Sequence, residues 1–240
     1  MVTRELSEDL AGWREPTTPA DLCLAGNHVV LAPMTLAAHA KPLFEAFRTD
    51  REGRIWDYLP YGPFDTLDTF EGWVKNFQGA KDPYFFAIER LDKKRVCGVA
   101  SFLRISPKDG SIEVGHINFS PLLQKTVAAT EAMYLMMKWA FEAGYRRYEW
   151  KCNALNAGSR RAAQRLGLSY EGVFRQATIV KGRNRDTAWF AAIDKEWPAL
   201  SKAFETYLSP DNFDADGRQK ASLSSLTEPL LHMKDPMVSG

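Results

Sequence analysis

The most informative stretch of this sequence covers residues 120–131 and reads Ser-Pro-Leu-Leu-Gln-Lys-Thr-Val-Ala-Ala-Thr-Glu. It joins a predicted strand to a long predicted helix of about 123–143, which Gly144 is suited to end. Small residues at the start of this helix leave a row of backbone N–H groups accessible, and the helix dipole favours an anion there. Taken alone, the stretch is slightly more typical of an ordinary helix start than of a binding site.

A second informative stretch covers residues 152–167 and reads Cys-Asn-Ala-Leu-Asn-Ala-Gly-Ser-Arg-Arg-Ala-Ala-Gln-Arg-Leu-Gly. It predicts a helix with one apolar face, whose arginines lie mostly on the other face. Asn156 and Ser159 fall at the corner between strand and helix, near the sheet edge where ligands bind in open α/β folds. An N-cap asparagine and a solvated face of arginines explain the same pattern, and this stretch alone favours that interpretation.

Hydrophobic periodicity and turn residues outline the remaining elements. The predicted strands cover about 29–31, 84–88, 96–105, 111–119, 147–152, 168–180 and 187–193. The predicted helices cover about 35–47, 66–77, 123–143, 156–167 and 196–207, and the fourth of them starts at either Asn156 or Gly158. Pro42 falls inside the first helical pattern, which predicts a kink or a start one turn later. The order contains one strand–helix–strand crossover. It therefore predicts an α/β (α+β) fold with a central twisted mixed β-sheet and helices on both faces.

The chain is expected to form one domain with two extensions. Residues 1–25 are predicted to be an arm laid over the domain, residues 26–208 the domain, and residues 209–240 a polar and largely mobile tail. A length of 240 residues and a hydrophobic fraction of 45% are sufficient for a packed core, so a mainly disordered chain is excluded.

Charge and cysteine usage limit the partners. The net charge of +1 provides no concentrated basic field, so nucleic acid is not expected to be the main partner. Neither an apolar run of about 18 residues nor a signal-peptide pattern occurs, so no membrane association is expected. Cys23, Cys97 and Cys152 lack metal-site spacing, which predicts reduced thiols in a cytoplasmic protein and no bound metal.

Considered together, the two stretches resemble the GNAT superfamily of acyl-CoA-dependent N-acyltransferases, whose fold has the predicted order of elements. The resemblance covers roughly residues 26–197 and is closest to the branch of the RimJ and RimL ribosomal-protein alanine acetyltransferases. Residues 124–131 are similar to the Gln/Arg-x-x-Gly-x-Gly/Ala loop and the Ala-Thr-Glu that follows it. Residues 156–159 are similar to an Asn-x-x-Ser corner, and residues 165–168 to a Leu-Gly-Phe motif. Each piece is weakly specific, but the ordered set is a strong signal.

This resemblance implies a site for acetyl-CoA, without a metal, between the fourth and fifth strands. The pyrophosphate would lie on the amides of residues 124–129, the pantetheine beside residues 117–119, and the thioester near Asn156 and Ser159. The implied cofactor-binding residues are Ile117, Asn118, Phe119, Gln124, Lys125, Thr126, Val127, Ala128, Ala129, Thr130, Asn156, Ser159 and Arg161.

Two positions depart from the family pattern. Val127 stands where the loop usually has glycine, so either its backbone is already helical or CoA lies slightly differently. Thr178 stands where the ribosomal alanine acetyltransferases can present a carboxylate as general base, which leaves both the base and the substrate class open. The resemblance also leaves open whether Arg160 or Arg161 faces the CoA phosphates.

Acetyl transfer from a thioester to an amine needs a neutral amine, a donor to the carbonyl oxygen and a proton for the leaving sulfur. Backbone N–H groups near Phe119 are the expected donors to the oxygen, and Ser159 is the candidate acid toward the thiolate. Ser159, Asn156 and His116 are the predicted catalytic residues. No metal takes part in this expectation.

Four residues are candidates for the general base: His116, Glu113, Asp57 and Asp186. His116 has a suitable pKa, but a packed ring in a half-buried strand is the favoured interpretation of it. Glu113 and His116 are three positions apart and face opposite sides of a strand unless a bulge intervenes. Asp186 follows two arginines, and pairing with one of them is an alternative explanation of it.

The loop of residues 56–64 contains four aromatic residues and is expected to shape the acceptor pocket, with Trp56, Asp57, Tyr58 and Tyr61 as substrate-binding residues. A loop pinned to the core by its aromatics is equally consistent with the pattern. The sequence therefore predicts an acetyl-CoA-dependent N-acetyltransferase acting on a small-molecule amine, compact with an apolar body, or on a flexible protein N-terminus. A non-catalytic acyl-CoA-binding sensor is the alternative, and formation of a homodimer is left open.

Overall fold

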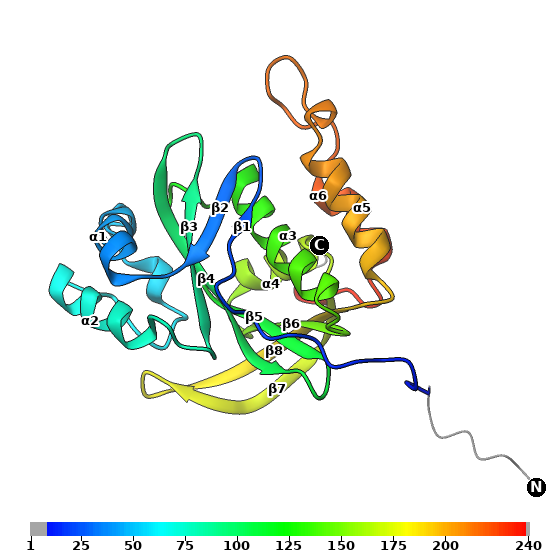
Figure 1. Cartoon of the computed structure of the whole chain (residues 1–240), viewed down its shortest axis with the longest axis horizontal. Coiled ribbons are helices and arrows are strands. Elements are labelled where there is room, and N and C mark those ends of the chain that lie inside the picture. The colour runs from blue at the N-terminus through cyan, green and yellow to red at the C-terminus, as the bar shows by residue number, and fades with distance from the viewer. Residues whose placement is uncertain (1–8, 239–240) are drawn as a thin grey trace, which may run out of the picture.

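The protein folds around an eight-stranded sheet that carries helices on both faces (Figure 1). The computed structural model describes residues 9–238. The strands are β1 (Leu24–Ala25), β2 (Val29–Pro33), β3 (Tyr84–Arg90), β4 (Arg95–Ser106), β5 (Ser111–Phe119), β6 (Arg147–Asn153), β7 (Ser169–Val180) and β8 (Arg183–Ile193). The helices are α1 (Leu36–Phe47), α2 (Leu67–Phe77), α3 (Val127–Glu142), α4 (Ala157–Arg165), α5 (Trp197–Leu208) and α6 (Leu223–Thr227), with short 3-10 turns η1 (Arg54–Trp56), η2 (Pro210–Asn212) and η3 (Glu228–Leu230).

The strand order β1-β2-β3-β4-β5-β6-β8-β7 makes the sheet mixed, because β5 and β6 pair in parallel while the other neighbours are antiparallel. The predicted fold class is therefore confirmed. The long helix α3 is the crossover that connects the two parallel strands. Such a crossover is needed because a short hairpin turn can join only antiparallel strands.

Alternating side chains of the central strands feed two hydrophobic cores, one on each face. On β3, Phe86 and Ile88 pack into the larger core, which also holds the buried face of α3. Phe85 and Ala87 point the other way and pack with α1 and α2 into the smaller core. The larger core continues under β6 and β8, whereas α1 and α2 belong to the half of the sheet formed by β2 to β4.

Side-chain caps fix the starts of α1 and α2. Thr35 accepts a hydrogen bond from the backbone N–H of Ala38, and Thr66 accepts one from Thr69. Helix α1 thus begins at Leu36 and continues through Pro42, so the alternative of a start one turn later is wrong.

The parallel strands β5 and β6 separate near the middle of the sheet. Their pairs run from Ser111 opposite Arg147 to Val114 opposite Trp150, and then stop. Just beyond the last pair, β5 contains a bulge against β4, and His116 in this bulge has a left-handed backbone with a φ of 50°. The bulge bends β5 away from β6 and opens the sheet at the position that the functional site occupies.

The C-terminal segment packs against the domain at several points, whereas the sequence predicts a largely mobile tail. The carboxylate of Asp235 forms a buried ion pair with the guanidinium of Arg160 on α4, with N–O distances of 2.6 and 2.5 Å. Leu223 of α6 is fully buried, and the hydroxyl of Thr227 donates to the carbonyl of Arg165. These few contacts anchor a segment whose overall polarity suggested mobility.

The predicted N-terminal arm lies partly outside the described residues, since residues 1–8 are not among them. Of its remainder, Thr17 accepts a hydrogen bond from the Tyr145 hydroxyl, and Leu24 and Ala25 already form the edge strand β1. None of the helices in residues 9–238 combines the length and apolar composition that a membrane span needs.

Candidate active site

A cavity of about 880 Å³ lies where β5 and β6 separate and where α3 and α4 begin. Its lining includes most of the residues predicted to bind the cofactor, namely Ile117, Asn118, Phe119, Gln124, Lys125, Thr126, Val127, Ala129, Thr130, Asn156, Ser159 and Arg161. Ala128 is the exception, because its side chain is buried in the larger core. The two sequence stretches, which residues 132–151 separate in the chain, thus line one cavity.

Unpaired backbone donors gather at the start of α3. Thr126 caps the helix by accepting a hydrogen bond from the N–H of Ala129 at 3.1 Å. The N–H groups of residues 125–128 have no acceptor within the described part of the chain. Four adjacent N–H groups at the positive end of a 16-residue helix form a site for an anion.

Val127 is the first residue of α3 and has a helical backbone, so the departure from glycine at this position causes no strain. The left-handed conformation falls instead on Lys125, whose φ is 59°. Of the two alternatives that the sequence left open, the structure has the helical one.

The start of α4 places a hydroxyl on the cavity wall. Asn156 caps the helix, its Oδ1 accepting from the N–H of Ser159 at 3.0 Å. The Nε1–H of Trp150 donates to Ser159 Oγ at 3.0 Å. Because this donor occupies one acceptor position of the oxygen, the hydroxyl proton of Ser159 is available to another acceptor.

The arginines of α4 are distributed differently from the prediction. Arg160 is buried against Asp235 and does not line the cavity, so Arg161 is the one of the predicted pair that does. Arg165, expected on the solvated face, also lines the cavity and donates to Thr130 Oγ1 at 3.1 Å. The helical pattern of α4 could not reveal this, because Arg165 meets Thr130 of α3 and Tyr207 of α5, which are distant in the sequence.

Sequence reasoning missed several lining residues because they come from the C-terminal segment or from distant elements. This group contains Tyr207 of α5, Phe213, Gly217 and Gln219. The hydroxyl of Tyr207 accepts a hydrogen bond from Arg165 at 3.2 Å. No motif marks them, and only the packing of the segment brings them to the cavity.

The bulge on β5 turns His116 toward the core shared by α1 and α2. Its imidazole stacks on the ring of Tyr61 with a centroid distance of 5.6 Å, and Nδ1 is 3.0 Å from the Tyr61 hydroxyl. Burial, together with the charges of Arg104 and Arg185, lowers the pKa of His116 to about 4. His116 is therefore a neutral, packed ring near pH 7, which agrees with the favoured interpretation of it.

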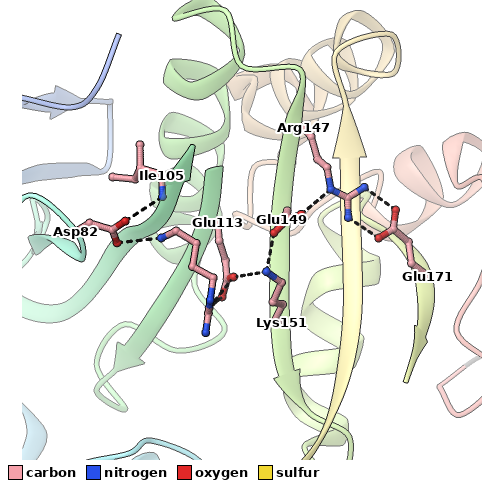
Figure 2. Close-up of polar contacts among 8 residues, drawn as sticks. Asp82, Ile105, Glu113, Arg147, Glu149, Lys151 and Glu171 are labelled. Atoms are coloured by element: carbon pink, nitrogen blue, oxygen red, sulfur yellow. Dashed lines mark hydrogen bonds and ion pairs between the residues drawn. The ribbon is translucent and has the colours of Figure 1, made fainter. Parts of the chain in front are cut away.

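Glu113 is buried and already engaged. Its carboxylate accepts two hydrogen bonds from Arg104 Nη1 at 2.8 and 2.7 Å, and Lys151 Nζ lies 2.8 Å away (Figure 2). The bulge does intervene between Glu113 and His116, so both lie on the sheet face of α1 and α2. The carboxylate of Glu113 is thus already paired with two cations, and Glu113 does not line the cavity.

The two aspartates proposed as bases differ in their surroundings. Asp186 accepts from the N–H of Gln176 at 2.7 Å and from Asn184 Nδ2 at 3.0 Å, and these bonds lower its pKa. It forms no ion pair with an arginine of residues 9–238, so that explanation of Asp186 is wrong. Asp57 is exposed directly after η1, and its carboxylate has no hydrogen-bond or ion-pair partner among residues 9–238.

The aromatic loop is largely part of the core. Trp56 is only 6% exposed and packs edge-on against Phe47 and Phe64, and burial raises the pKa of Tyr61. Tyr58 remains 39% exposed. Ile55, just before the loop, lines the cavity instead.

Two hydrogen bonds attach this loop to the opposite side of the opening. The Tyr58 hydroxyl donates to the carbonyl of Leu155 at 3.3 Å, and Lys181 Nζ, at the tip of the β7–β8 hairpin, donates to the carbonyl of Trp56 at 3.0 Å. The loop therefore bridges the open end of the sheet, whether or not its rings contact an acceptor.

Comparison with known proteins places this geometry in a family. The sequence pattern of the Acetyltransferase (GNAT) domain matches residues 28–169. A GCN5-related N-acetyltransferase from Brucella melitensis aligns with 91% of this chain and 100% of its own, with 41% identity and a TM-score of 0.89. An acetyltransferase of the GNAT family from Chromobacterium violaceum aligns with 81% of this chain and 97% of its own, with 40% identity and a TM-score of 0.75.

The RimL ribosomal L7/L12 alpha-N-protein acetyltransferase shares the fold at 19% identity, with a TM-score of 0.61 over 72% of this chain and 94% of its own. The predicted membership of the GNAT acetyltransferases is confirmed by the domain match and by the relatives of 40–41% identity, and RimL adds a likeness of fold. No curated protein is significantly similar to this sequence.

Proposed function

Since the chain belongs to the GNAT family of N-acetyltransferases, we propose that it transfers the acetyl group of acetyl-CoA to a primary amine of a small molecule or of a protein N-terminus by direct attack. The observation that carries the proposal is the set of four unpartnered N–H groups of residues 125–128 beside the cavity. The pyrophosphate of CoA offers these donors several anionic oxygens. The exposed guanidinium of Arg161 adds positive charge at the same wall.

Acetyl-CoA supplies an activated acetyl thioester when it is bound. The amine nitrogen then forms a bond to the carbonyl carbon as the carbon–sulfur bond breaks. The backbone N–H groups near Phe119, on the separated end of β5, stabilise the carbonyl oxygen in this proposal. Ser159 gives its proton to the leaving sulfur, and the proton that the amine loses returns to the Ser159 oxygen through solvent. The hydrogen bond from Trp150 supports the required orientation of the Ser159 hydroxyl. Asn156 holds the helix corner on which Ser159 lies.

The proposed acceptor is an amine of low basicity. His116 has a pKa of about 4, so it cannot remove a proton from an ammonium group before the reaction, although it can receive one after the bond has formed. The amine must therefore enter neutral. An α-amino group, with a pKa near 8, is neutral far more often at pH 7.5 than a lysine side chain with a pKa near 10.4. This comparison favours peptide N-termini and small α-amines over lysine residues.

The burial of Trp56 changes the expected role of the aromatic loop. Little of this ring is available to an acceptor, so the hypothesis of a mainly apolar acceptor pocket rests on Tyr58 and Ile55. Asp57 is exposed and is proposed to hold the ammonium form of the acceptor at the surface, before the amine loses its proton to solvent and enters the site neutral. A reducing, cytoplasmic setting belongs to the same proposal, because the cysteines are free thiols.

The test combines acetyl-CoA titration with thiol release over a panel of peptides and small amines. We expect saturable binding and thiol release that depends on the amine, faster for α-amines than for lysine side chains. Binding of acetyl-CoA without release on any amine would contradict the proposal and favour a non-catalytic acyl-CoA sensor.

A further inference from the structure

A network of charged side chains crosses the sheet face opposite α3. Figure 2 shows that it runs from Glu113 through Lys151 and Glu149 to Arg147 and Glu171. Each N–O distance in this chain is between 2.5 and 2.8 Å. With Arg104 at its other end, the network joins three cations and three carboxylates, so its charges balance.

Arg185 on β8 lies beside this network but is not part of it. Strand β8 pairs with β6 without a register shift, and Lys151 opposite Trp189 lies 3.9 Å above the Trp189 ring. Because side chains alternate along a strand, Arg185 shares the face of Trp189 and Lys151. The Nε of Arg185 is buried without a hydrogen-bond acceptor, and its guanidinium forms no ion pair in the described part of the chain.

The nearest carboxylate cannot serve Arg185. Glu113 is the one carboxylate whose charge acts on Arg185, and both Arg104 and Lys151 already hold it. Burial accordingly lowers the pKa of Arg185, and the charge of Arg104 lowers it further. A partly buried guanidinium without a counter-ion costs free energy that an incoming anion recovers.

The position of Arg185 relates it to the reaction. Its charge acts on His116, which lies in the bulge where β5 leaves β6. Lys181, four residues earlier in the same hairpin, holds the aromatic loop across this opening through the carbonyl of Trp56. Arg185 therefore lies on the face of the sheet opposite α3 and α4, near the opening between β5 and β6.

We propose that Arg185 binds a carboxylate carried by the acceptor next to its reacting amine. A guanidinium presents two parallel N–H donors that match a carboxylate, and its binding energy is largest where water is excluded. The inference rests on the proposed acetyl transfer and names its substrate class, an amine with a nearby carboxylate. That carboxylate belongs either to a free α-amino acid or to an acidic side chain at a peptide N-terminus.

Matched acceptor pairs separate these two sources. One arm compares free amino acids with their amides, and the other compares peptides that begin with Glu or Asp with those that begin with Gln or Asn. In the wild-type protein we expect kcat/KM to be about tenfold or more higher for the carboxylate member of at least one pair, as for a charge-assisted hydrogen bond. The arm that shows the preference identifies the source.

The variant Arg185→Gln should reduce this preference to near unity, and Arg185→Lys should restore part of it. The matched control is Arg183→Gln, which removes an exposed guanidinium from the same strand and should keep the preference. Acetyl-CoA titration and thermal unfolding of each variant check that the fold is intact.

Three outcomes would overturn the inference. If wild type acetylates neutral and carboxylate acceptors equally well, Arg185 does not select the acceptor, while the proposed acetyl transfer stands. If Arg185→Gln and Arg183→Gln reduce the preference equally, a general positive field explains it. If no amine is acetylated although acetyl-CoA binds, the proposed function fails, and the acceptor role of Arg185 fails with it.

Discussion

Two regions of the molecule meet where β5 and β6 separate. The cofactor side is the cavity at the start of α3 and α4, and the acceptor side is the sheet face around His116 and Arg185. The cofactor side offers mainly backbone N–H groups and small side chains from two short stretches of sequence. The acceptor side offers ionisable side chains and rings that come from β4, β5, β6, β8 and the loop after α1. A site of backbone groups tolerates changes of side chain unless they add charge or bulk. A site of charged side chains depends on each partner and on pH.

The largest effect is expected where the cofactor side depends on the C-terminal segment. Asp235→Ala leaves the guanidinium of Arg160 buried without its counter-ion. Arg160 is the next residue after Ser159 on α4. Breaking a buried pair of this kind costs about 3–5 kcal/mol of unfolding free energy. Chemical denaturation should show this loss.

The control for Asp235→Ala is Lys234→Ala, which removes an exposed pair with Glu228 from the neighbouring position. Its unfolding free energy should stay close to that of the wild type. Equal stability of both variants would mean that the C-terminal segment is not anchored through Arg160. Helix α4 would then be stable without the C-terminal segment.

Val127→Asp is expected to break the cofactor side alone. The new carboxylate would lie at the first residue of α3, beside the N–H groups proposed to hold the pyrophosphate. Repulsion between like charges at this distance should raise the dissociation constant of acetyl-CoA by about 100-fold, measured by titration. At saturating acetyl-CoA the KM of the acceptor should change little.

Val127→Ala serves as the control because it keeps the helical start and adds no charge. It should bind acetyl-CoA about as well as the wild type. If Val127→Asp also bound acetyl-CoA normally, the phosphates of CoA would lie away from the start of α3.

The acceptor side should respond to pH through His116. Its pKa is about 4 in the folded protein and about 6.5 when unfolded, so between these values the unfolded chain binds the proton more tightly. The corresponding stability is present above pH 6.5 and is lost as the pH falls toward 4, by on the order of 2–3 kcal/mol.

His116→Phe keeps a stacked ring but removes the titrating group. Its unfolding free energy should fall less than that of the wild type between pH 6.5 and pH 4, as measured by denaturation at matched pH values. An identical pH dependence for both proteins would show that His116 titrates normally and that the ring is more accessible than its packing against Tyr61 indicates.

The two helix starts that line the cavity could be predicted from the sequence because their signals are local. The capping residues Thr126 and Asn156 and the small residues near them specify the two helix starts within a few positions of the chain. The start of α3 was placed about four residues too early, since residues 123–126 form a turn before the helix. Arg165 was assigned to solvent because a helical pattern does not show which other element covers that face.

The acceptor side was harder to predict because it depends on register and on contacts between distant residues. The bulge at His116 adds one residue to β5 and so changes which side chains share a face. Arg185 lacks a counter-ion within residues 9–238 because the nearby Glu113 is paired with Arg104 and Lys151. These pairings depend on the three-dimensional structure and cannot be predicted from the sequence. Likewise, the sequence did not indicate that Asp235 would pair with Arg160, 75 residues earlier.

Ser159 lies where the two sides meet, and its removal should have the smallest of these effects. Ser159→Ala deletes the hydroxyl proposed to protonate the leaving sulfur but keeps the backbone N–H that Asn156 caps, so the start of α4 should remain intact. Because protonation of the thiolate matters in the transition state, kcat should fall by about tenfold while the KM of acetyl-CoA changes little. Initial rates at varied acetyl-CoA and saturating acceptor separate the two constants.

Two further variants show whether the effect of Ser159→Ala is chemical. Trp150→Phe removes the donor that orients the Ser159 hydroxyl and should lower kcat by a smaller factor, whereas Ser201→Ala, on the exposed face of α5, should leave both constants unchanged. A rise in the KM of acetyl-CoA with unchanged kcat would instead assign Ser159 to binding. Its hydroxyl would then belong to the cofactor side, and the proton for the sulfur would have to come from water or from the acceptor side of the opening.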